Sequence, residues 1–154
     1  MGLGDSITEG SDDFASYLFP LWEKLMSAGY EFDFIGPRES KCRIGTLKCG
    51  GYSGHTVEFL DSKVDSLYRL YPADIILLHA GHNHFVEEKP VSRMVASYRS
   101  IIAKIWKINP QAVILLAKVI PSGKLPKYSY IPELNKQIER LVKEINSARL
   151  ICVD

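Results

Sequence analysis

Short, almost uninterrupted apolar runs alternate with stretches of helical periodicity along all 154 residues of the sequence. Such runs are typical of strands that are buried on both faces, as in a parallel sheet with helices on either side. Counting a short first strand, the pattern predicts five strands, at residues 1–5, 30–36, 73–81, 111–121 and 148–154.

The first helical stretch spans residues 14–25, where apolar side chains recur every three or four positions. Ser11 or Asp12 can cap its start, and Gly29 can end it. Because Pro20 interrupts the pattern, we expect either a kink or a helix that begins late.

Three further stretches have the same periodicity. Thr56 and Ser92 are placed to cap the second and third helices, and Pro132 suits the first turn of the fourth. The expected core stripes are Val57, Leu60, Val64 and Leu67; Val95, Tyr98, Ile102 and Ile105; and Leu134, Ile138, Leu141 and Ile145.

This alternation predicts an α/β fold: a three-layer, doubly wound, flavodoxin-like parallel sheet of five strands with helices on both faces. The natural strand order is 2-1-3-4-5, and ligands of such sheets bind beyond the carboxyl ends of the strands. No linker, repeat or low-complexity segment divides the sequence, so we expect one domain over residues 1–154.

Composition excludes several classes of protein. With 46% hydrophobic and 24% charged residues, the chain is neither disordered nor fibrous. A net charge of +1 without a basic run gives no support to nucleic-acid binding, and no apolar run reaches the roughly 20 residues of a membrane span. No signal peptide is visible, which leaves a cytoplasmic location and secretion after leader removal both open. Nothing indicates an oligomeric state.

The three cysteines are Cys42, Cys49 and Cys152. Their number is odd, and the Cys42–Cys49 pair lacks a second pair that would complete a zinc site. We expect free thiols, with a small Cys42–Cys49 disulfide as the alternative, and we expect no cofactor.

The stretch GDSITEG, residues 4–10, has two interpretations. Ser6 and Glu9 have the spacing of a capping box, in which both side chains satisfy amides at a helix start. Because Gly10 and Ser11 follow at once, such a box would cap only about one helical turn. Alternatively, Ser6 leaves the first strand as a nucleophile.

Polar residues also follow two other strands or precede a helix at the same predicted edge of the sheet. They are Gly54 and His55 before the second helix, and His82, Asn83 and His84 after the third strand. A nucleophilic serine needs a base, and its oxyanion needs donors such as backbone amides and an asparagine side chain.

The segments GLGDSITEG, GGYSGHT and HAGHNHF, in this order and spacing, resemble the first three sequence blocks of the SGNH hydrolases, also called GDSL-type esterases. GYEFDFIG and SGHTVEFL are similar to carbohydrate esterases of family 3, many of which are acetylxylan esterases. The resemblance covers essentially the whole chain.

The resemblance implies roles for three residues. Ser6 falls on the nucleophile, and its backbone amide is one oxyanion donor. Gly54 falls on the glycine that offers a second amide, and Asn83 falls on the asparagine whose side chain is the third donor. The implied substrate is an acylated carbohydrate or another small ester, with no cofactor and no nucleic-acid or membrane partner.

Two features depart from the family pattern. His84 stands where the family usually has an aspartate, which changes the hydrogen bonding of the third block. The resemblance also implies a final Asp-x-x-His block that supplies the general base and its orienting acid, whereas this sequence stops at Asp154. Asp154 is more similar to the strand-end aspartate before that block. We therefore expect the domain to lack its C-terminal block.

The histidines have alternative interpretations. We expect His79 to be a hydrogen-bonded core residue and His55 to contact only substrate or solvent. His82 or His84 can stand in for the absent base, and a zinc site of His82, His84 and Asp5 is a weaker alternative. Otherwise Asp5 shapes the turn before Ser6.

Two remaining groups are ambiguous. Gly50, Gly51 and Gly54 lack the Lys and Ser/Thr that end a phosphate-binding loop, so Gly51 is expected to be a loop glycine. Tyr128 and Tyr130 follow the fourth strand, where either a substrate-binding loop or a plain surface loop is expected.

The sequence therefore predicts a serine esterase that removes short acyl groups, acetyl above all, from a carbohydrate. The alternative is a catalytically incomplete fragment or a glycan- or ester-binding module of the same fold, and a nucleotide-binding flavodoxin-like domain is a third interpretation. The sugar, the acyl length and the base are not predicted, and the 154 residues alone are expected to be nearly inactive.

Overall fold

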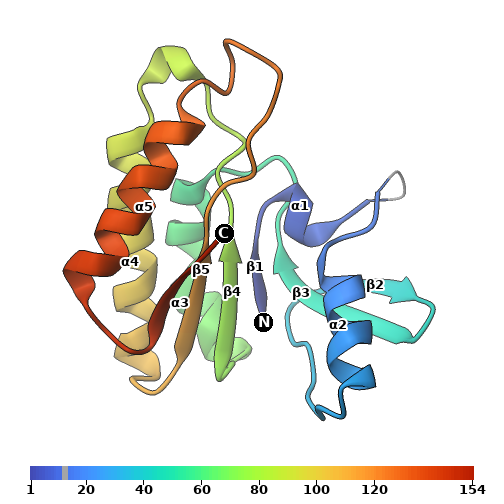
Figure 1. Cartoon of the computed structure of the whole chain (residues 1–154). Coiled ribbons are helices and arrows are strands. Elements are labelled where there is room, and N and C mark those ends of the chain that lie inside the picture. The colour runs from blue at the N-terminus through green and yellow to red at the C-terminus, as the bar shows by residue number, and fades with distance from the viewer. Residues whose placement is uncertain (12–13) are drawn as a thin grey trace.

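The computed structural model describes residues 1–11 and 14–154 and has a mostly parallel sheet at its centre (Figure 1). The strand order in this part of the chain is β2-β3-β1-β4-β5-β6, and β2 alone runs antiparallel to its neighbour. The strands are β1 (Gly2–Gly4), β2 (Arg38–Cys42), β3 (Gly45–Gly51), β4 (Ile75–His79), β5 (Val113–Ala117) and β6 (Leu150–Val153).

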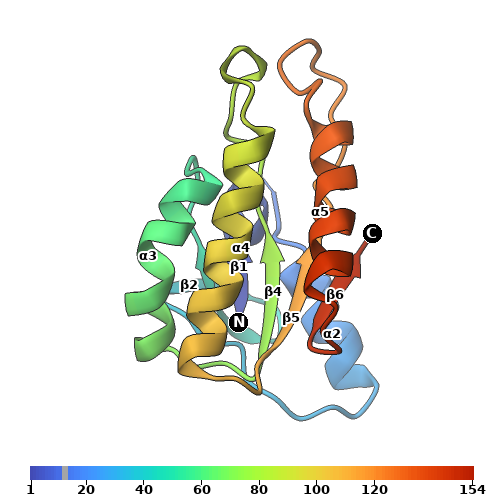
Figure 2. The same ribbon diagram turned by 90° about the vertical axis from the view of Figure 1, so that its left-hand side faces the viewer.

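Helices cover both faces of the sheet. Figures 1 and 2 show α3, α4 and α5 side by side on one face and α2 on the other. The predicted doubly wound α/β class is therefore confirmed. The helices are α1 (Ser6–Glu9), α2 (Leu18–Ser27), α3 (Val57–Leu70), the 3₁₀ turn η1 (Val86–Glu88), α4 (Val91–Ile108) and α5 (Ile131–Ile145). Within the described ranges, no helix is long and apolar enough to cross a membrane.

The two faces of the sheet differ in how well they are covered. Ile114 and Leu116 of β5 are fully buried in the main core, whereas Leu115 between them is only half-buried. On β4 the side chain of Ile75 is 53% exposed. The main hydrophobic core therefore lies under α3, α4 and α5, and α2 covers a smaller core beside β3.

The expected strand at residues 30–36 is wrong. Within the described ranges this aromatic segment pairs with no strand, and Phe32 and Phe34 pack edge-to-face with ring centroids 5.4 Å apart. Phe34 also packs edge-on to Trp22 of α2. The apolar run at residues 30–36 therefore reflects aromatic side chains packed against α2 and not a strand hydrogen-bonded into the sheet.

The strand beside β1 is instead β3, and β2 adds a sixth, antiparallel strand outside it. The end of β3 does not form an apolar run, because the close approach of Glu9 requires glycine there. A Cβ on Gly51 would lie 2.5 Å from the backbone of Glu9. Gly51 is thus the last residue of a strand and not a loop glycine. With β3 in the place of the second strand, the parallel strands keep the expected 2-1-3-4-5 order.

Most of the helix signals are confirmed. The Thr56 hydroxyl accepts from the Phe59 amide at 3.3 Å, Pro132 lies in the first turn of α5, and Gly29 after α2 has φ +84°. The helix does begin late, at Leu18, so that Pro20 lies in its first turn and Phe14, which lies outside the helix, is 44% exposed.

The other expected caps are wrong or lie outside the described residues. Ser11 does not cap α2, because Tyr17 directly precedes that helix, and Asp12 lies outside the described residues. Ser92 does not cap α4, because Pro90 precedes the helix and Val91 begins it. Proline with its fixed φ suits the start of a helix, which explains why the helix starts one residue before the serine.

Cys49 and Cys152 are free thiols. Burial raises the pKa of the Cys49 thiol, and it does the same for Cys152. Both are therefore weak nucleophiles at neutral pH. The alternative of a Cys42–Cys49 disulfide is wrong, because Cys49 is free and lies opposite Arg38 while Cys42 lies opposite Gly45; the side chain of Cys42 lies outside the described part of the chain.

Candidate active site

The turn that follows β1 places Ser6 at the first position of α1. Asp5, not Ser6, caps this helix: its Oδ1 accepts from the Ile7 amide at 3.1 Å. Glu9 does not reach back to the helix start, since its Oε2 accepts from the Ser53 amide at 2.5 Å. The capping box is therefore not formed, and among the described residues the Ser6 hydroxyl has no hydrogen-bond partner.

Gly4 permits this turn because the backbone there has no room for a side chain. A Cβ on Gly4 would lie 2.0 Å from the backbone oxygen of His79 and 2.2 Å from the Thr8 hydroxyl. The close approach brings the start of α1 against the end of β4. Ser6 therefore lies beside the residues that leave β4.

Asp5 is fully buried and ties the two strand ends together. Its Oδ2 accepts from the Gly81 amide at 3.1 Å and from the His82 amide at 3.4 Å. Burial by itself raises the pKa of Asp5, but its interactions with His82 and with the Ile7 amide outweigh burial and lower it. Asp5 is thus a charged anchor that shapes the turn, as expected.

The second block forms a tight turn over residues 52–55. The His55 amide donates to the Tyr52 carbonyl at 3.2 Å, and Gly54 has φ +77°, as the third residue of a type II turn requires. The Tyr52 amide donates to the Gly4 carbonyl at 2.9 Å, which joins this turn to β1. A Cβ on Gly54 would meet nothing within 4 Å, so open space lies above it.

Asn83 connects the third block to the second. Its side-chain Nδ2 donates to the His55 carbonyl at 2.9 Å, which leaves the other N–H of that amide group free. In the described part of the chain, the backbone N–H groups of Ser6 and Gly54 also have no acceptor. The structure therefore brings Ser6, Gly54 and Asn83 to one edge of the sheet, each with a donor available to an anionic oxygen.

Two tyrosines that the sequence does not single out for this purpose hold the strand exit. Tyr130 donates its hydroxyl proton to the Gly81 carbonyl at 2.7 Å, and Tyr98 donates to the Ala80 carbonyl. Both are buried. The sequence predicts Tyr130 in a substrate-binding loop or a surface loop. No sequence signal connects the hydroxyl of Tyr130 or Tyr98 with a backbone carbonyl that is 49 or 18 positions away.

His82 lies between Asp5 and the loop after β5. Its Nε2 is 2.8 Å from the Ile120 carbonyl oxygen, and its Nδ1 is 3.8 Å from Asp5 Oδ2. Burial opposes protonation, but Asp5 and the Ile120 carbonyl outweigh burial and raise the pKa of His82. Both ring nitrogens thus face acceptors, which favours the imidazolium.

His84, which replaces the usual aspartate, has its own partner. It is 1% exposed, and its Nε2 is 2.7 Å from Glu58 Oε2 in the first turn of α3. Glu58 Oε1 lies 2.9 Å from Arg93 Nε, and Arg93 also pairs with Glu88. Burial opposes ionisation of Glu58, but His84 outweighs it and lowers the pKa of that carboxyl.

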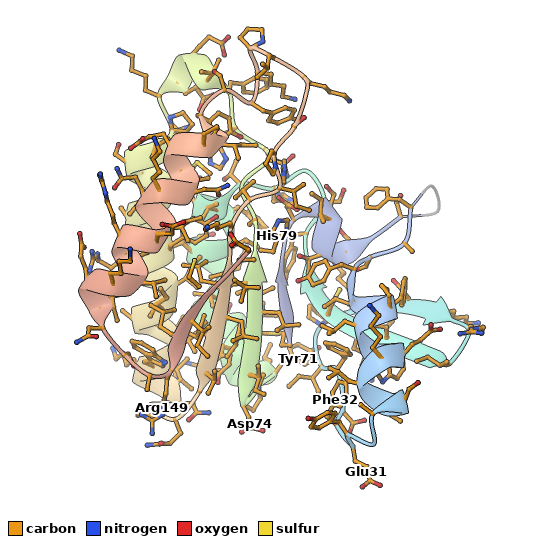
Figure 3. The ribbon with its side chains drawn as sticks, viewed as in Figure 1. Glu31, Phe32, Tyr71, Asp74, His79 and Arg149 are labelled. Atoms are coloured by element: carbon orange, nitrogen blue, oxygen red, sulfur yellow. The ribbon has the colours of Figure 1, made fainter. Side chains whose placement is uncertain are left out.

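His79 differs from its expectation. Figure 3 places it at the carboxyl end of β4, opposite Asp74 at the other end of the same strand. It is 5% exposed, so it is a core residue, but neither ring nitrogen has a partner among the described residues. Desolvation accordingly lowers its pKa, and Tyr17 packs against its ring at 6.1 Å.

The site has two parts with different burial. We call residues 4–6 and 79–84 the floor; most of them are buried. We call residues 52–55, 85–89 and 120–128 the rim, which is mostly exposed. On the rim, His55 stacks on Phe59 at 3.7 Å, and Tyr128 packs edge-on to His82 at 5.9 Å.

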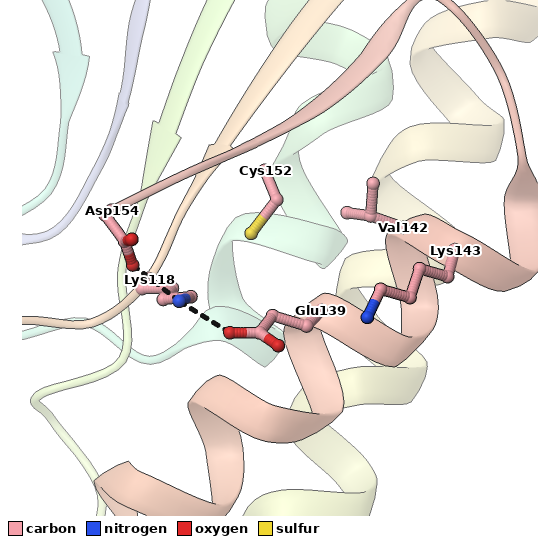
Figure 4. A pocket seen from close by; sticks show the side chains of 6 residues that line it. All are labelled: Lys118, Glu139, Val142, Lys143, Cys152 and Asp154. Atoms are coloured by element: carbon pink, nitrogen blue, oxygen red, sulfur yellow. Dashed lines mark ion pairs between the residues drawn. The ribbon is translucent and has the colours of Figure 1, made fainter.

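A pocket of about 270 Å³ lies between β6 and α5, and Lys118 and Asp154, which follow the carboxyl ends of β5 and β6, line it (Figure 4). Lys118 crosses it, with Nζ 2.5 Å from both Glu139 and Asp154. These two carboxylates, Asp154 first, raise the pKa of Lys118. Asp154 thus pairs with Lys118 directly after the end of β6.

Residues 1–11 and 14–154 contain no group of three or more His, Cys, Asp or Glu side chains that could hold a metal ion. Asp5 and His82 face each other, whereas His84 binds Glu58.

Among the described residues, an unpartnered serine hydroxyl and three N–H groups without acceptors thus lie at the carboxyl edge of a doubly wound sheet. The model of the GDSL-like lipase/acylhydrolase family matches residues 3–154. The chain belongs to that family.

Solved structures agree on the fold. A family 3 carbohydrate esterase from Talaromyces cellulolyticus is 24% identical with a TM-score of 0.81, covering 99% of this chain and 76% of its own. The family 3 carbohydrate esterase of Clostridium thermocellum is also 24% identical, with a TM-score of 0.82 and coverage of 99% and 75%. An acetyl esterase variant with an acetate ion is 23% identical, with a TM-score of 0.81 and coverage of 99% and 76%. No curated protein matches the chain.

Proposed function

We propose that this chain is a serine esterase that removes short acyl groups, most of all acetyl, from a carbohydrate. The observation that carries the proposal is the edge of the sheet where, among the described residues, the Ser6 hydroxyl has no partner and Ser6, Gly54 and Asn83 each keep an N–H without an acceptor. The family and its solved relatives, which include carbohydrate and acetyl esterases, support the choice of substrate.

In the proposed reaction, the Ser6 hydroxyl oxygen attacks the ester carbonyl while a base takes its proton. The amides of Ser6 and Gly54 and the free N–H of Asn83 stabilise the oxyanion. Collapse of this intermediate releases the sugar hydroxyl, which receives the proton back, and leaves an acyl group on Ser6. Water then hydrolyses the acyl-enzyme.

The base of this proposal is a histidine of an Asp-x-x-His block that these 154 residues do not include. His82 and His84 are poor candidates, because His82 faces the Ile120 carbonyl and Asp5 while His84 is bound to Glu58. Without a base, the chain would retain only the catalysis that binding and the oxyanion donors provide.

The test compares the 154-residue chain with a form extended at its C-terminus by a segment that carries Asp-x-x-His. Turnover of 4-nitrophenyl acetate should rise by roughly three orders of magnitude on extension. In the extended form, Ser6→Ala should abolish turnover with an unchanged circular dichroism spectrum, and Asn83→Ala should lower it about one hundred- to one thousandfold.

Other outcomes would redirect the proposal. If the short chain is already fast and His82→Ala or His84→Ala silences it, a loop histidine is the base. If neither form hydrolyses nitrophenyl or acetylated glycan esters, the esterase proposal fails and the glycan- or ester-binding module becomes the better account.

A further inference from the structure

The rim carries a lysine held by two aromatic rings. Lys127 Nζ lies 5.3 Å from the ring centroid of Phe85 and 5.0 Å from that of Tyr128. An ammonium group over a ring face is attracted by the ring electrons, and two rings restrict its position more than one. The contact joins the loop after β4 to the loop after β5.

This cluster adjoins the floor of the site. Tyr128 packs edge-on to His82 with centroids 5.9 Å apart, and His82 follows the Gly81 amide that Asp5 binds. Phe85 is two residues beyond Asn83 along the chain. A substrate whose ester reaches Ser6 would therefore extend over this part of the rim.

The charge of Lys127 is not neutralised by the described residues: none of their carboxylates lies within ion-pair distance of it. The rim offers a direct contrast, because Arg38 lies 5.3 Å over the Tyr52 ring but also pairs with Glu9 at 3.6 Å. One ring-bound cation is thus compensated and the other is available.

The surrounding loops add to the positive charge. Residues 85–89 and 120–128 contain Lys89, Lys124 and Lys127 against Glu87 and Glu88, and Glu88 is already paired with Arg93. The side chain of Phe85 is 54% exposed. An apolar surface beside an uncompensated ammonium suits a ligand with an apolar ring face and a negative group.

We propose that Phe85, Lys127 and Tyr128 form a subsite for a uronate-bearing glycan, in which the ammonium of Lys127 binds the sugar carboxylate. The inference rests on the proposed esterase function, and it names the substrate class as an acylated acidic polysaccharide. The rings hold the lysine in place beforehand, and no oxygen of the described residues accepts a hydrogen bond from its ammonium, which leaves it able to bind the carboxylate.

The test measures binding without catalysis, using the 154-residue chain with Ser6→Ala. Isothermal titration compares neutral xylotetraose, xylotetraose carrying one glucuronic acid, and a sulfated xylotetraose. The uronate-bearing sugar should bind about fivefold more tightly than the neutral one, as a partly exposed charge pair allows, and added salt should reduce the difference. Preference for the sulfated sugar instead would show that the anion is not a uronate.

Three variants complete the test. Lys127→Met should remove the preference, Lys127→Arg should keep most of it, and Lys24→Met on the exposed surface of α2 should not change it. Equal binding of neutral and charged sugars, a preference that survives Lys127→Met, or no binding of either sugar would overturn the subsite. If the C-terminally extended form with Ser6 intact did not hydrolyse 4-nitrophenyl acetate, that result would count against the esterase function and not against the subsite.

Discussion

The floor and the rim of the site differ in how much freedom the fold leaves to each residue. On the floor, a Cβ at Gly4 would lie 2.0 Å from a backbone oxygen, and the Asp5 carboxylate accepts from three backbone amides. On the rim, a Cβ at Gly54 or Gly123 would meet nothing within 4 Å. The difference suggests that the floor fixes the chemistry, whereas the rim can change with the substrate.

The comparison is tested most strongly by adding one methyl group to each part. Gly4→Ala should destabilise the fold by about 4 kcal/mol or more, because the clash is with backbone and cannot relax cheaply. Gly54→Ala should cost only about 1–2 kcal/mol, for its positive φ, and Gly123→Ala should stay within about 0.5 kcal/mol. Urea unfolding followed by circular dichroism measures all three, and equal losses at Gly4 and Gly123 would refute the distinction.

A second test concerns the pair that fastens the floor to α3. Glu58→Met and His84→Phe should each lower the free energy of unfolding by about 1–2 kcal/mol, since each leaves the other polar side chain without its hydrogen-bond partner. The double variant should cost clearly less than the sum of the two.

The exposed pair Arg99–Glu144, with N–O distance 2.6 Å, is the matched control for that cycle. Its coupling should be too small to measure, because both side chains are more than half exposed. Additive losses at Glu58 and His84 would mean that the buried contact adds no stability and that His84 is tolerated for another reason.

The smallest expected effect lies where floor meets rim, at His82. Its pKa is raised in the folded chain, so its contribution to stability is full below the ordinary histidine value of about 6.5 and is lost as the pH rises through the folded value. Asp5 keeps its charge in mildly acidic solution because its pKa is lowered.

The wild-type protein should therefore exceed His82→Gln in unfolding free energy more at pH 5.5 than at pH 8.5, by less than about 1 kcal/mol. His79, whose lowered pKa acts in the opposite direction, is present in both proteins and largely cancels from the difference. A difference that grows with pH would show that His82 is not held as the imidazolium.

How far the sequence predicts this molecule depends on the kind of signal. Thr56 and Pro132 act locally, within one helical turn, so their roles follow from spacing alone. The strand at residues 30–36 was wrong because burial of Phe34 by α2 produces the same apolar run as a strand.

The site shows the same division. Short sequence motifs are enough to single out Ser6, Gly54 and Asn83. The structure brings these residues to one edge of the sheet, and their catalytic roles stay predictions. The contacts of Tyr130 with Gly81 and of His84 with Glu58 join residues 49 and 26 positions apart. Pairs of this kind have no periodicity, so a single sequence cannot reveal them.

The three-residue strand β1 has a consequence for how the protein reaches its folded state. Leu3 is opposite Gly50 on one side and Leu78 on the other, so this strand is held only by neighbours distant in the sequence. Contacts between residues far apart in the sequence form slowly, because closing the large loop costs entropy before the contacts can stabilise the chain. Since Ser6 follows β1 directly, the nucleophile gains its place only when both pairings exist. Hydrogen exchange at the Leu3 amide should therefore report on assembly of the site and of the whole sheet together.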